Sequence, residues 1–211
     1  MFFDIDGTLV PHTSSGQHLA DRLGHAAVVR RAEAGYAAGI LSNADVSVLD
    51  ARGWAAWTPA EVRNFLNSLP LVDGIAETVK WCRRRGLAPV LATLAWEPVG
   101  TYLCNRFGFD QSCGPRLEIV NGRYSGEVAA HFDEMDKRDF AVDVAAQLGV
   151  DLIRCAAVGD SRSDLPLFAE VGMTIAFNAT SATRAAAHAS ADGTDLRSLV
   201  PLLATWLDAR L

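Results

Sequence analysis

Short apolar segments alternate with stretches of helical spacing through most of the chain, and this alternation constrains the fold more than any other feature. Parallel strands need long crossover connections, which are usually helices and almost always right-handed. The pattern therefore predicts an α/β fold with a doubly wound parallel sheet, in which ligands bind beyond the carboxyl ends of the strands. The segments expected to be strands are residues 1–5, 87–93, 152–158 and 174–177.

Residues 11–70 depart from this alternation, because their apolar residues follow helical spacing and no strand is evident. The last helix of the segment has a capping box, with Thr58 as the N-cap and Glu61 three residues later. We expect a small helical cap domain here, inserted after the first strand, and a catalytic core built from residues 1–10 and 71–211. The apolar positions that recur at intervals of three and four are Leu19, Leu23, Ala26 and Val29.

The rest of the chain supplies helices between the strands and one hairpin. The hairpin spans residues 117–128, where Asn121-Gly122 suits a type I′ turn. The basic run Arg83-Arg84-Arg85, followed by Gly86, is typical of a helix C-terminus. The expected helices are residues 74–85, 97–107, 136–148, 165–170, 182–188 and 196–207.

Composition excludes several classes of protein. Half of the 211 residues are hydrophobic, so the chain can bury a substantial core, and a net charge of −6 gives no general attraction to nucleic acid or to an anionic membrane. The most apolar long stretch, residues 86–104, contains Pro89, Glu97 and Pro98, so no membrane span is expected.

The first residues of the sequence and the cysteines indicate a cellular location. Asp4 and Asp6 interrupt the opening apolar run, which argues against a signal peptide. The 4 cysteines lack the close pairing of a zinc site, so reduced thiols and a cytoplasmic location are expected. The oligomeric state stays open.

Polar residues follow three of the predicted strands. Asp4 and Asp6 follow the first, Thr93 the second, and Asp160 and Asp164 the strand at residues 152–158. A lone Asp-x-Asp is more often a turn or a cap, but four carboxylates at one sheet edge would repel strongly without a cation. All-oxygen ligands of this kind match Mg²⁺, which keeps waters and a substrate phosphate in its coordination sphere.

Two further residues fit a bound phosphate. Lys137 lies at the start of its predicted helix, where a cation opposes the macrodipole, so a nearby anion would explain it. The alternative is an ordinary exposed lysine. Thr93 could donate its hydroxyl to a phosphate near the start of the next helix, or could be a simple strand-end residue.

Taken together, these motifs resemble the haloacid dehalogenase superfamily in its usual motif order. Two stretches, Gly122-Arg123-Tyr124-Ser125-Gly126 and Ile175-Ala176-Phe177-Asn178-Ala179, are most similar to its phosphoserine phosphatase branch, as is the helical insertion. The motifs that carry the resemblance are Asp4-Ile5-Asp6-Gly7-Thr8-Leu9-Val10, Thr93, Lys137 and Gly159-Asp160-Ser161-Arg162-Ser163-Asp164.

The resemblance implies a Mg²⁺-dependent phosphatase that hydrolyses a small amino-acid, sugar or polyol phosphate through an aspartyl-phosphate. Asp4 would be the nucleophile, and Asp6 would protonate the leaving alcohol and then activate water. The metal would be held by the Asp4 carboxylate, the Asp6 backbone carbonyl and Asp160, with Asp164 in support. Phosphate would contact Thr93, Lys137, Gly7 and Ser163.

Other activities stay possible within this resemblance. A phosphotransferase or mutase would pass the phosphoryl group to another alcohol, and a regulator would bind a phosphorylated ligand without turnover. The second aspartate argues against a dehalogenase, whose halide leaving group needs neither a general acid nor a metal. A P-type ion pump is excluded by the lack of expected membrane spans.

The sequence departs from the phosphoserine phosphatase pattern at two positions, one in the cap and one in the last motif. Thr13 stands where that branch usually has a glutamate that holds the substrate's amino group, and Ser163 stands where it usually has an asparagine. Trp54 and Trp57 are more typical of packing residues than of a binding platform. The cap residues that could face a substrate are His12, His18, Tyr36, Asn43, Arg52, Trp54 and Trp57.

Overall fold

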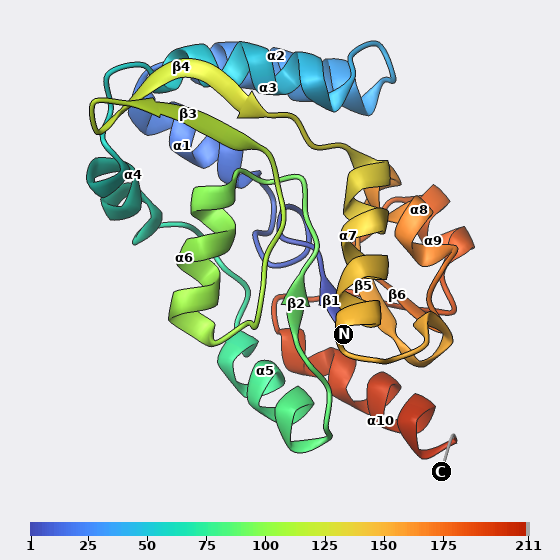
Figure 1. Ribbon diagram of the computed structural model, residues 1–211. Helices are drawn as coiled ribbons and strands as arrows, with labels where there is room; N and C mark the ends of the chain where they lie inside the picture. Colours follow the sequence, from blue (N-terminus) through green and yellow to red (C-terminus); the bar gives the residue numbers. More distant parts are fainter. Residues whose placement is uncertain (210–211) are drawn as a thin grey trace.

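The computed structural model describes residues 1–209. Five parallel strands form the central sheet in the order β2-β1-β5-β6-β7, which confirms the predicted doubly wound α/β fold (Figure 1). The chain moves from β1 to one neighbour and later returns to the other side of β1, so the order of the strands switches there. The strands of this sheet are β1 (Phe2–Phe3), β2 (Val90–Leu91), β5 (Ala156–Gly159), β6 (Met173–Phe177) and β7 (Ala189–Ala191).

Helices cover both faces of the sheet because its strands are apolar on both sides. Phe2 packs in one buried cluster with residues of α7 and α8, and Phe3 packs in the other with residues of α5, α6 and α10. This alternation is the period of two expected of a strand. The helices of the core are α5 (Ile75–Arg84), α6 (Glu97–Phe107), α7 (Glu134–Gln147), α8 (Leu165–Phe168), α9 (Ser181–Ala186) and α10 (Val200–Asp208).

The segment after β1 is helical, and α4 starts at the predicted capping box of Thr58 and Glu61. The hairpin of β3 (Arg116–Val120) and β4 (Arg123–Ala130) forms a separate sheet that lies against these helices (Figure 1). Strand β4 is joined to the cap by two backbone hydrogen bonds, from the Ala56 N–H to the Tyr124 carbonyl and from the Tyr124 N–H to the Trp57 carbonyl. The helices of the cap are α1 (Ser15–Leu23), α2 (Ala26–Ala37), α3 (Asn43–Ala51) and α4 (Pro59–Leu66). The division between core and cap at residues 10 and 70 stays a prediction.

One local expectation about a strand is wrong, and one strand of the sheet was not expected. The apolar run at residues 152–155 is not strand: Leu152–Arg154 form a 3₁₀ turn, with the Cys155 N–H donating to the Leu152 carbonyl at 2.8 Å. Ile153 is 61% exposed there, so an apolar residue at this position does not indicate a buried strand. Strand β7 was not expected, because its sequence Ala-Ser-Ala has none of the β-branched or aromatic residues typical of strands.

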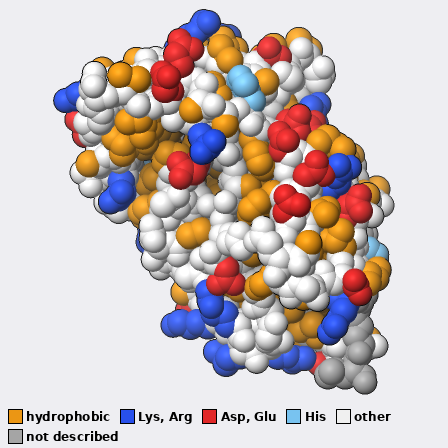
Figure 2. Space-filling view, in the orientation of Figure 1, with side chains coloured by type: hydrophobic (Ala, Val, Ile, Leu, Met, Phe, Trp, Pro, Cys, Tyr) orange, Lys and Arg blue, Asp and Glu red, His pale blue; other side chains and the backbone are white. Residues whose placement is uncertain are grey.

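The surface carries mixed charge. In the view of Figure 2, Lys and Arg side chains gather at the lower end, over α5, where the triplet Arg83-Arg84-Arg85 ends the helix as expected. Arg83 is paired with Asp110 and Arg85 with Asp208. Within residues 1–209, no helix has the length and hydrophobicity that a bilayer crossing requires.

Candidate active site

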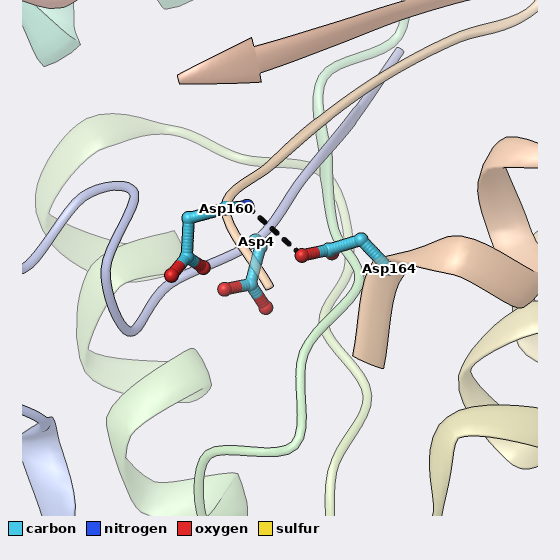
Figure 3. Close-up of side chains that lie close together, drawn as sticks. All are labelled: Asp4, Asp160 and Asp164. Carbon is cyan, nitrogen blue, oxygen red and sulfur yellow. Dashed lines mark hydrogen bonds between the residues drawn. The ribbon is translucent and has the colours of Figure 1, made fainter. Parts of the chain in front are cut away.

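Three neighbouring strands bring their polar end residues to one edge of the sheet. Asp4 follows β1, Thr93 comes after β2, and Asp160 follows β5, which lies on the other side of β1. The Asp4 N–H donates to the Val158 carbonyl at 2.9 Å, which fixes the register at this edge. Carboxylate oxygens of Asp4, Asp160 and Asp164 lie within 4.8 Å of one another (Figure 3). The structure thus brings together three of the four carboxylates that the sequence predicted to meet, and the carboxylate of Asp6 is the exception.

Two glycines leave room for these carboxylates. Gly7 has φ +87°, and a Cβ built there would lie 2.2 Å from Asp160 Oδ2. A Cβ at Gly159 would lie 2.1 Å from Asp164 Cγ. A side chain at either position would therefore displace an acidic group of the cluster. The Gly7 N–H itself donates to the Val10 carbonyl at 2.9 Å, so it is engaged within its own turn.

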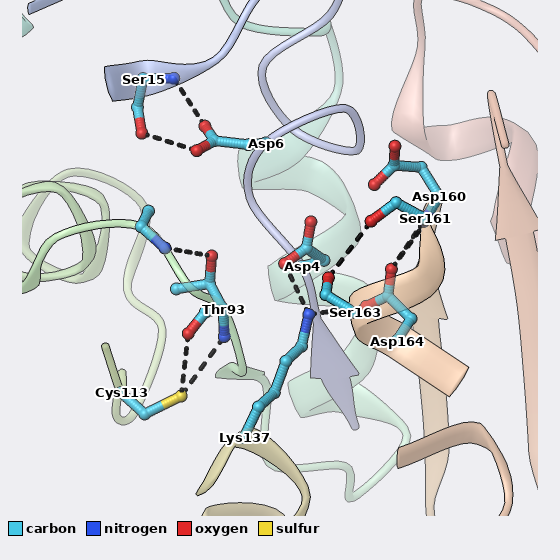
Figure 4. A network of polar contacts seen from close by, with 11 residues as sticks. Asp4, Asp6, Ser15, Thr93, Cys113, Lys137, Asp160, Ser161, Ser163 and Asp164 are labelled. Carbon is cyan, nitrogen blue, oxygen red and sulfur yellow. Dashed lines mark hydrogen bonds and ion pairs between the residues drawn. The ribbon is translucent and has the colours of Figure 1, made fainter. Parts of the chain in front are cut away.

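Lys137 is the counterion of the cluster. Its side chain is 0% exposed, and Nζ donates to Asp4 Oδ1 at 2.7 Å and to Asp164 Oδ1 at 2.6 Å (Figure 4). Burial alone would lower the pKa of Lys137, but the charges of Asp164 and Asp4 and their hydrogen bonds raise it above its ordinary value. Lys137 is therefore charged, and its reading as an exposed lysine is wrong.

Asp164 organises the loop that follows β5. Its second oxygen, Oδ2, accepts the backbone N–H groups of Asp160 at 3.0 Å and Ser161 at 3.1 Å. The Ser163 hydroxyl is buried and lies 3.2 Å from the Ser161 hydroxyl. Both oxygens of Asp164 thus accept hydrogen bonds from the protein, which suits the supporting role that the family resemblance implies for it.

The electrostatics of the cluster favour a cation. Burial raises the pKa of Asp4, with Lys137 opposing the shift, and burial together with the charges of Asp4 and Asp164 raises the pKa of Asp160. Within the described chain, Asp160 Oδ1 is buried without a hydrogen-bond partner. A hard divalent cation would satisfy this oxygen and neutralise the repulsion, so the residues present fit a Mg²⁺ site.

Asp6 lies apart from this cluster. Its carboxylate points to the start of α1, where Oδ1 accepts the Ser15 N–H at 2.7 Å and Oδ2 accepts the Ser15 hydroxyl at 3.0 Å (Figure 4). Burial raises the pKa of Asp6 to about 6, although both hydrogen bonds from Ser15 oppose the shift. Asp6 can therefore hold or release a proton near neutral pH, as a general acid and base must.

Thr93 is held in place on both sides. Its hydroxyl oxygen accepts the Ala95 N–H at 3.1 Å, and its own N–H donates to Cys113 Sγ at 3.3 Å. Because that oxygen is already an acceptor, the hydroxyl proton can be donated to another group. Thr93 is 1% exposed and lines the cavity that also contains Asp4.

The cavity lies between the sheet edge and the cap and has a volume of about 170 Å³. Pockets for drug-sized ligands are usually about 300–1,000 Å³, so this one suits a small molecule. Of the cap residues considered from sequence, Tyr36 and Asn43 line it, while His12, His18, Arg52, Trp54 and Trp57 are absent from its walls. Trp54 is fully buried and packs edge-on against Trp96 and Tyr124, which confirms its reading as a packing residue.

Sequence reasoning missed several polar residues of the cap. Asp50 is buried in the cavity wall, where it accepts the indole N–H groups of Trp54 at 3.1 Å and Trp96 at 2.7 Å. His25 Nε2 lies 2.6 Å from the same carboxylate. Glu33 also lines the cavity and accepts the Ser14 hydroxyl. Ser14 and Ser15, which bind Glu33 and Asp6, were also missed. The sequence signal that could have found them is their position at the start of a helix, where Ser14 is the N-cap of α1.

The chain is similar to known hydrolases along most of its length. A model of the haloacid dehalogenase-like hydrolase family matches residues 1–169. A phosphoserine phosphatase of Albidiferax ferrireducens is 31% identical over 134 residues, which cover 61% of this chain and 56% of the relative. Phosphoserine phosphatase SerB2 of Mycobacterium tuberculosis is 29% identical over 189 residues, which cover 89% of this chain and 46% of the relative.

The solved structures extend the likeness to the whole fold. A substrate-bound phosphoserine phosphatase superposes with a TM-score of 0.85 at 22% identity, covering 95% of this chain and 96% of the other. The chain spans about half the length of the curated relatives that it matches, with 56% of the first and 37% of the second. The match to the family model covers most of the chain and includes Asp4, Thr93, Lys137 and Asp160. This protein therefore belongs to the haloacid dehalogenase-like hydrolase family and resembles its phosphoserine phosphatases.

Proposed function

We propose that the protein is a Mg²⁺-dependent phosphatase that hydrolyses a small phosphomonoester through an aspartyl-phosphate on Asp4. The observation that carries this proposal is the position of the Asp4 carboxylate. It lies at the sheet edge between the Lys137 ammonium, 2.7 Å away, and the carboxylate of Asp160. The proposed nucleophile thus lines the cavity, with a buried cation and a second carboxylate directly beside it.

Asp4 would attack phosphorus with the oxygen that Lys137 leaves free. A carboxylate needs no base to become a nucleophile once a cation favours its ionised form, and Lys137 supplies that cation. We expect the phosphoryl oxygens to contact Lys137, the Thr93 hydroxyl and Ser163, and both Thr93 and Ser163 line the cavity. These donors would stabilise the negative charge that spreads over the oxygens during transfer.

Asp6 would act on the leaving group. With a pKa of about 6 it can protonate the departing alcohol and then accept a proton from the water that hydrolyses the acyl phosphate. Ser15 would hold the carboxylate in position through its N–H and hydroxyl.

The Asp4 carboxylate, the Asp6 backbone carbonyl and Asp160 would hold Mg²⁺, and Asp164 would support them by fixing the loop and Lys137. When bound, the cation would neutralise the charge of the phosphoryl oxygens and of the carboxylates around them. Gly7 would serve by leaving space for Asp160, because its N–H is already engaged with Val10.

Release of phosphate from p-nitrophenyl phosphate tests this proposal. The wild-type protein should hydrolyse the ester with Mg²⁺ and not with EDTA, and Asp4→Asn should abolish turnover. The matched control is Asp143→Asn, since Asp143 is exposed on α7 and should leave the rate unchanged. Retention of most activity in Asp4→Asn would rule out Asp4 as the nucleophile.

A further inference from the structure

The cavity of the proposed site is strongly acidic. Asp4, Asp6, Glu33 and Asp50 all line the cavity, and among residues 1–209 no Arg or Lys side chain does. Lys137 is absent from the cavity walls, and its ammonium is hydrogen-bonded to the carboxylates of Asp4 and Asp164. Arg162 stacks over the ring of the lining residue Tyr36, but it is absent from the cavity walls and pairs with Glu134. A carboxylate on the substrate would therefore find no Lys or Arg among the lining residues, and it would face carboxylates of its own charge.

Glu33 is the acidic group best placed for the alcohol part of a substrate. Two consecutive serines at the start of α1 hold two carboxylates: Ser15 holds Asp6, and Ser14 donates its hydroxyl to Glu33. Because Asp6 would protonate the leaving oxygen, the alcohol must extend from Asp6 into the cavity. Glu33 is held by Ser14, the residue before Ser15, and its side chain lines the same cavity as Asp6.

The carboxylates of Asp50 and Glu33 differ in how many hydrogen bonds they already accept from the protein. A Cβ at Gly16 would lie 3.4 Å from Glu33 Oε1 and 3.8 Å from Asp50 Oδ2, so both carboxylates flank this glycine. Asp50 accepts two indole N–H groups and contacts His25. In the described part of the chain, Glu33 is hydrogen-bonded to Ser14 alone. Burial, together with the charge of Asp50, raises the pKa of Glu33, so a cation at this point would be favoured.

We infer that the substrate is the phosphomonoester of a small amino alcohol that carries no carboxylate, and that Glu33 binds its ammonium group. This inference rests on the proposed phosphatase activity and narrows its substrate class. An ammonium beside Glu33 would neutralise the acidic wall, whereas phosphoserine would add a carboxylate to it. Glu33 is then a specificity residue that lies outside the phosphoryl-transfer chemistry.

The test compares kcat/KM for three probes that differ only in the alcohol: O-phosphoethanolamine, O-phosphoserine and glycerol 1-phosphate. We expect O-phosphoethanolamine to exceed the other two by at least about tenfold. Glu33→Gln should lower its kcat/KM by about 10- to 100-fold, as expected for loss of a charged hydrogen bond. The same variant should change glycerol 1-phosphate and p-nitrophenyl phosphate by less than about threefold, and Glu33→Asp, which keeps the charge, should restore part of the preference.

Glu118→Gln is the matched control, because Glu118 is exposed on β3 away from the cavity. Equal or better turnover of phosphoserine or glycerol 1-phosphate, or an equal loss on every probe in Glu33→Gln, would overturn the inference and leave the phosphatase proposal intact. Absence of Mg²⁺-dependent phosphate release from all probes, p-nitrophenyl phosphate included, would overturn both. Melting temperatures of the variants show whether a loss comes from unfolding.

Discussion

Replacement of Lys137 by methionine should destabilise the protein as well as inactivate it. Lys137 is fully buried, and its ammonium is shared by Asp4 at 2.7 Å and Asp164 at 2.6 Å. Methionine fills a similar volume but leaves both carboxylates without their cation. Breaking a buried ion pair in this way costs about 3–5 kcal/mol. Because each kcal/mol lowers the melting temperature by roughly 2–4 °C in a chain of this size, the expected fall is about 6–20 °C.

The assay is thermal unfolding in EDTA and in saturating Mg²⁺. The chain has a second lysine, Lys80, which is exposed on α5, so Lys80→Met is the matched control and should change the melting temperature by less than about 2 °C. Mg²⁺ should recover part of the stability of Lys137→Met, since a dication beside Asp4 replaces some of the missing charge. Phosphatase activity in Mg²⁺ should fall by about 10²–10³. A Lys137→Met protein that melts within 2 °C of wild type in EDTA would refute the assignment of Lys137 as the counterion.

Two other substitutions test the roles of single residues. In EDTA, Asp6→Asn should raise the free energy of unfolding at pH 8 by about 3 kcal/mol, because burial raises the pKa of Asp6 from 3.8 to about 6. This gain in stability should be absent below about pH 4, where Asp6 is protonated in both the folded and the unfolded protein, and it should develop between pH 4 and 6. Urea titrations at several pH values measure it, and a gain that does not change with pH would contradict this cause. Gly7→Ala should weaken Mg²⁺ binding by about 10- to 100-fold in calorimetry, because its Cβ would lie 2.2 Å from Asp160 Oδ2. Gly24→Ala has the same backbone strain, with φ +90° and nothing within 4 Å, and should bind Mg²⁺ normally; equal weakening in both variants would point to strain alone.

The features that could be predicted from the sequence are those fixed by short segments. Asp4 and Asp160 each follow an apolar strand directly, so the parallel sheet alone brings them together. The capping box at Thr58 and the Asn121-Gly122 turn are also local, and both occur in the structure as expected, with positive φ at both turn residues. Lys137 could be predicted because a cation at the start of a helix opposes the helix macrodipole and indicates a nearby anion. In the structure, the anions are the carboxylates of Asp4 and Asp164.

The features that were missed depend on how distant segments pack. Glu33 lies on α2 and Asp50 on α3, and only the docking of the cap turns these side chains toward the cavity. The contact between Asp50 and Trp96 joins residues 46 positions apart, so no local pattern signals it. Arg52, one of the cap residues that could have faced a substrate, lies in a 3₁₀ segment, is exposed and does not line the cavity. Composition of the cap therefore did not reveal its acidic wall.

The central claim is that Asp4 receives the phosphoryl group, and chemical trapping tests it most directly. In Asp6→Asn the first step with p-nitrophenyl phosphate should proceed, because p-nitrophenolate leaves without a general acid, while hydrolysis of the acyl phosphate should be slow. Acid quenching followed by borohydride reduction converts a phosphorylated aspartate to homoserine, which mass spectrometry of the N-terminal peptide detects. The account predicts homoserine at position 4 in the presence of Mg²⁺. A modification at any other carboxylate, or a burst of p-nitrophenol without modification of Asp4, would contradict it.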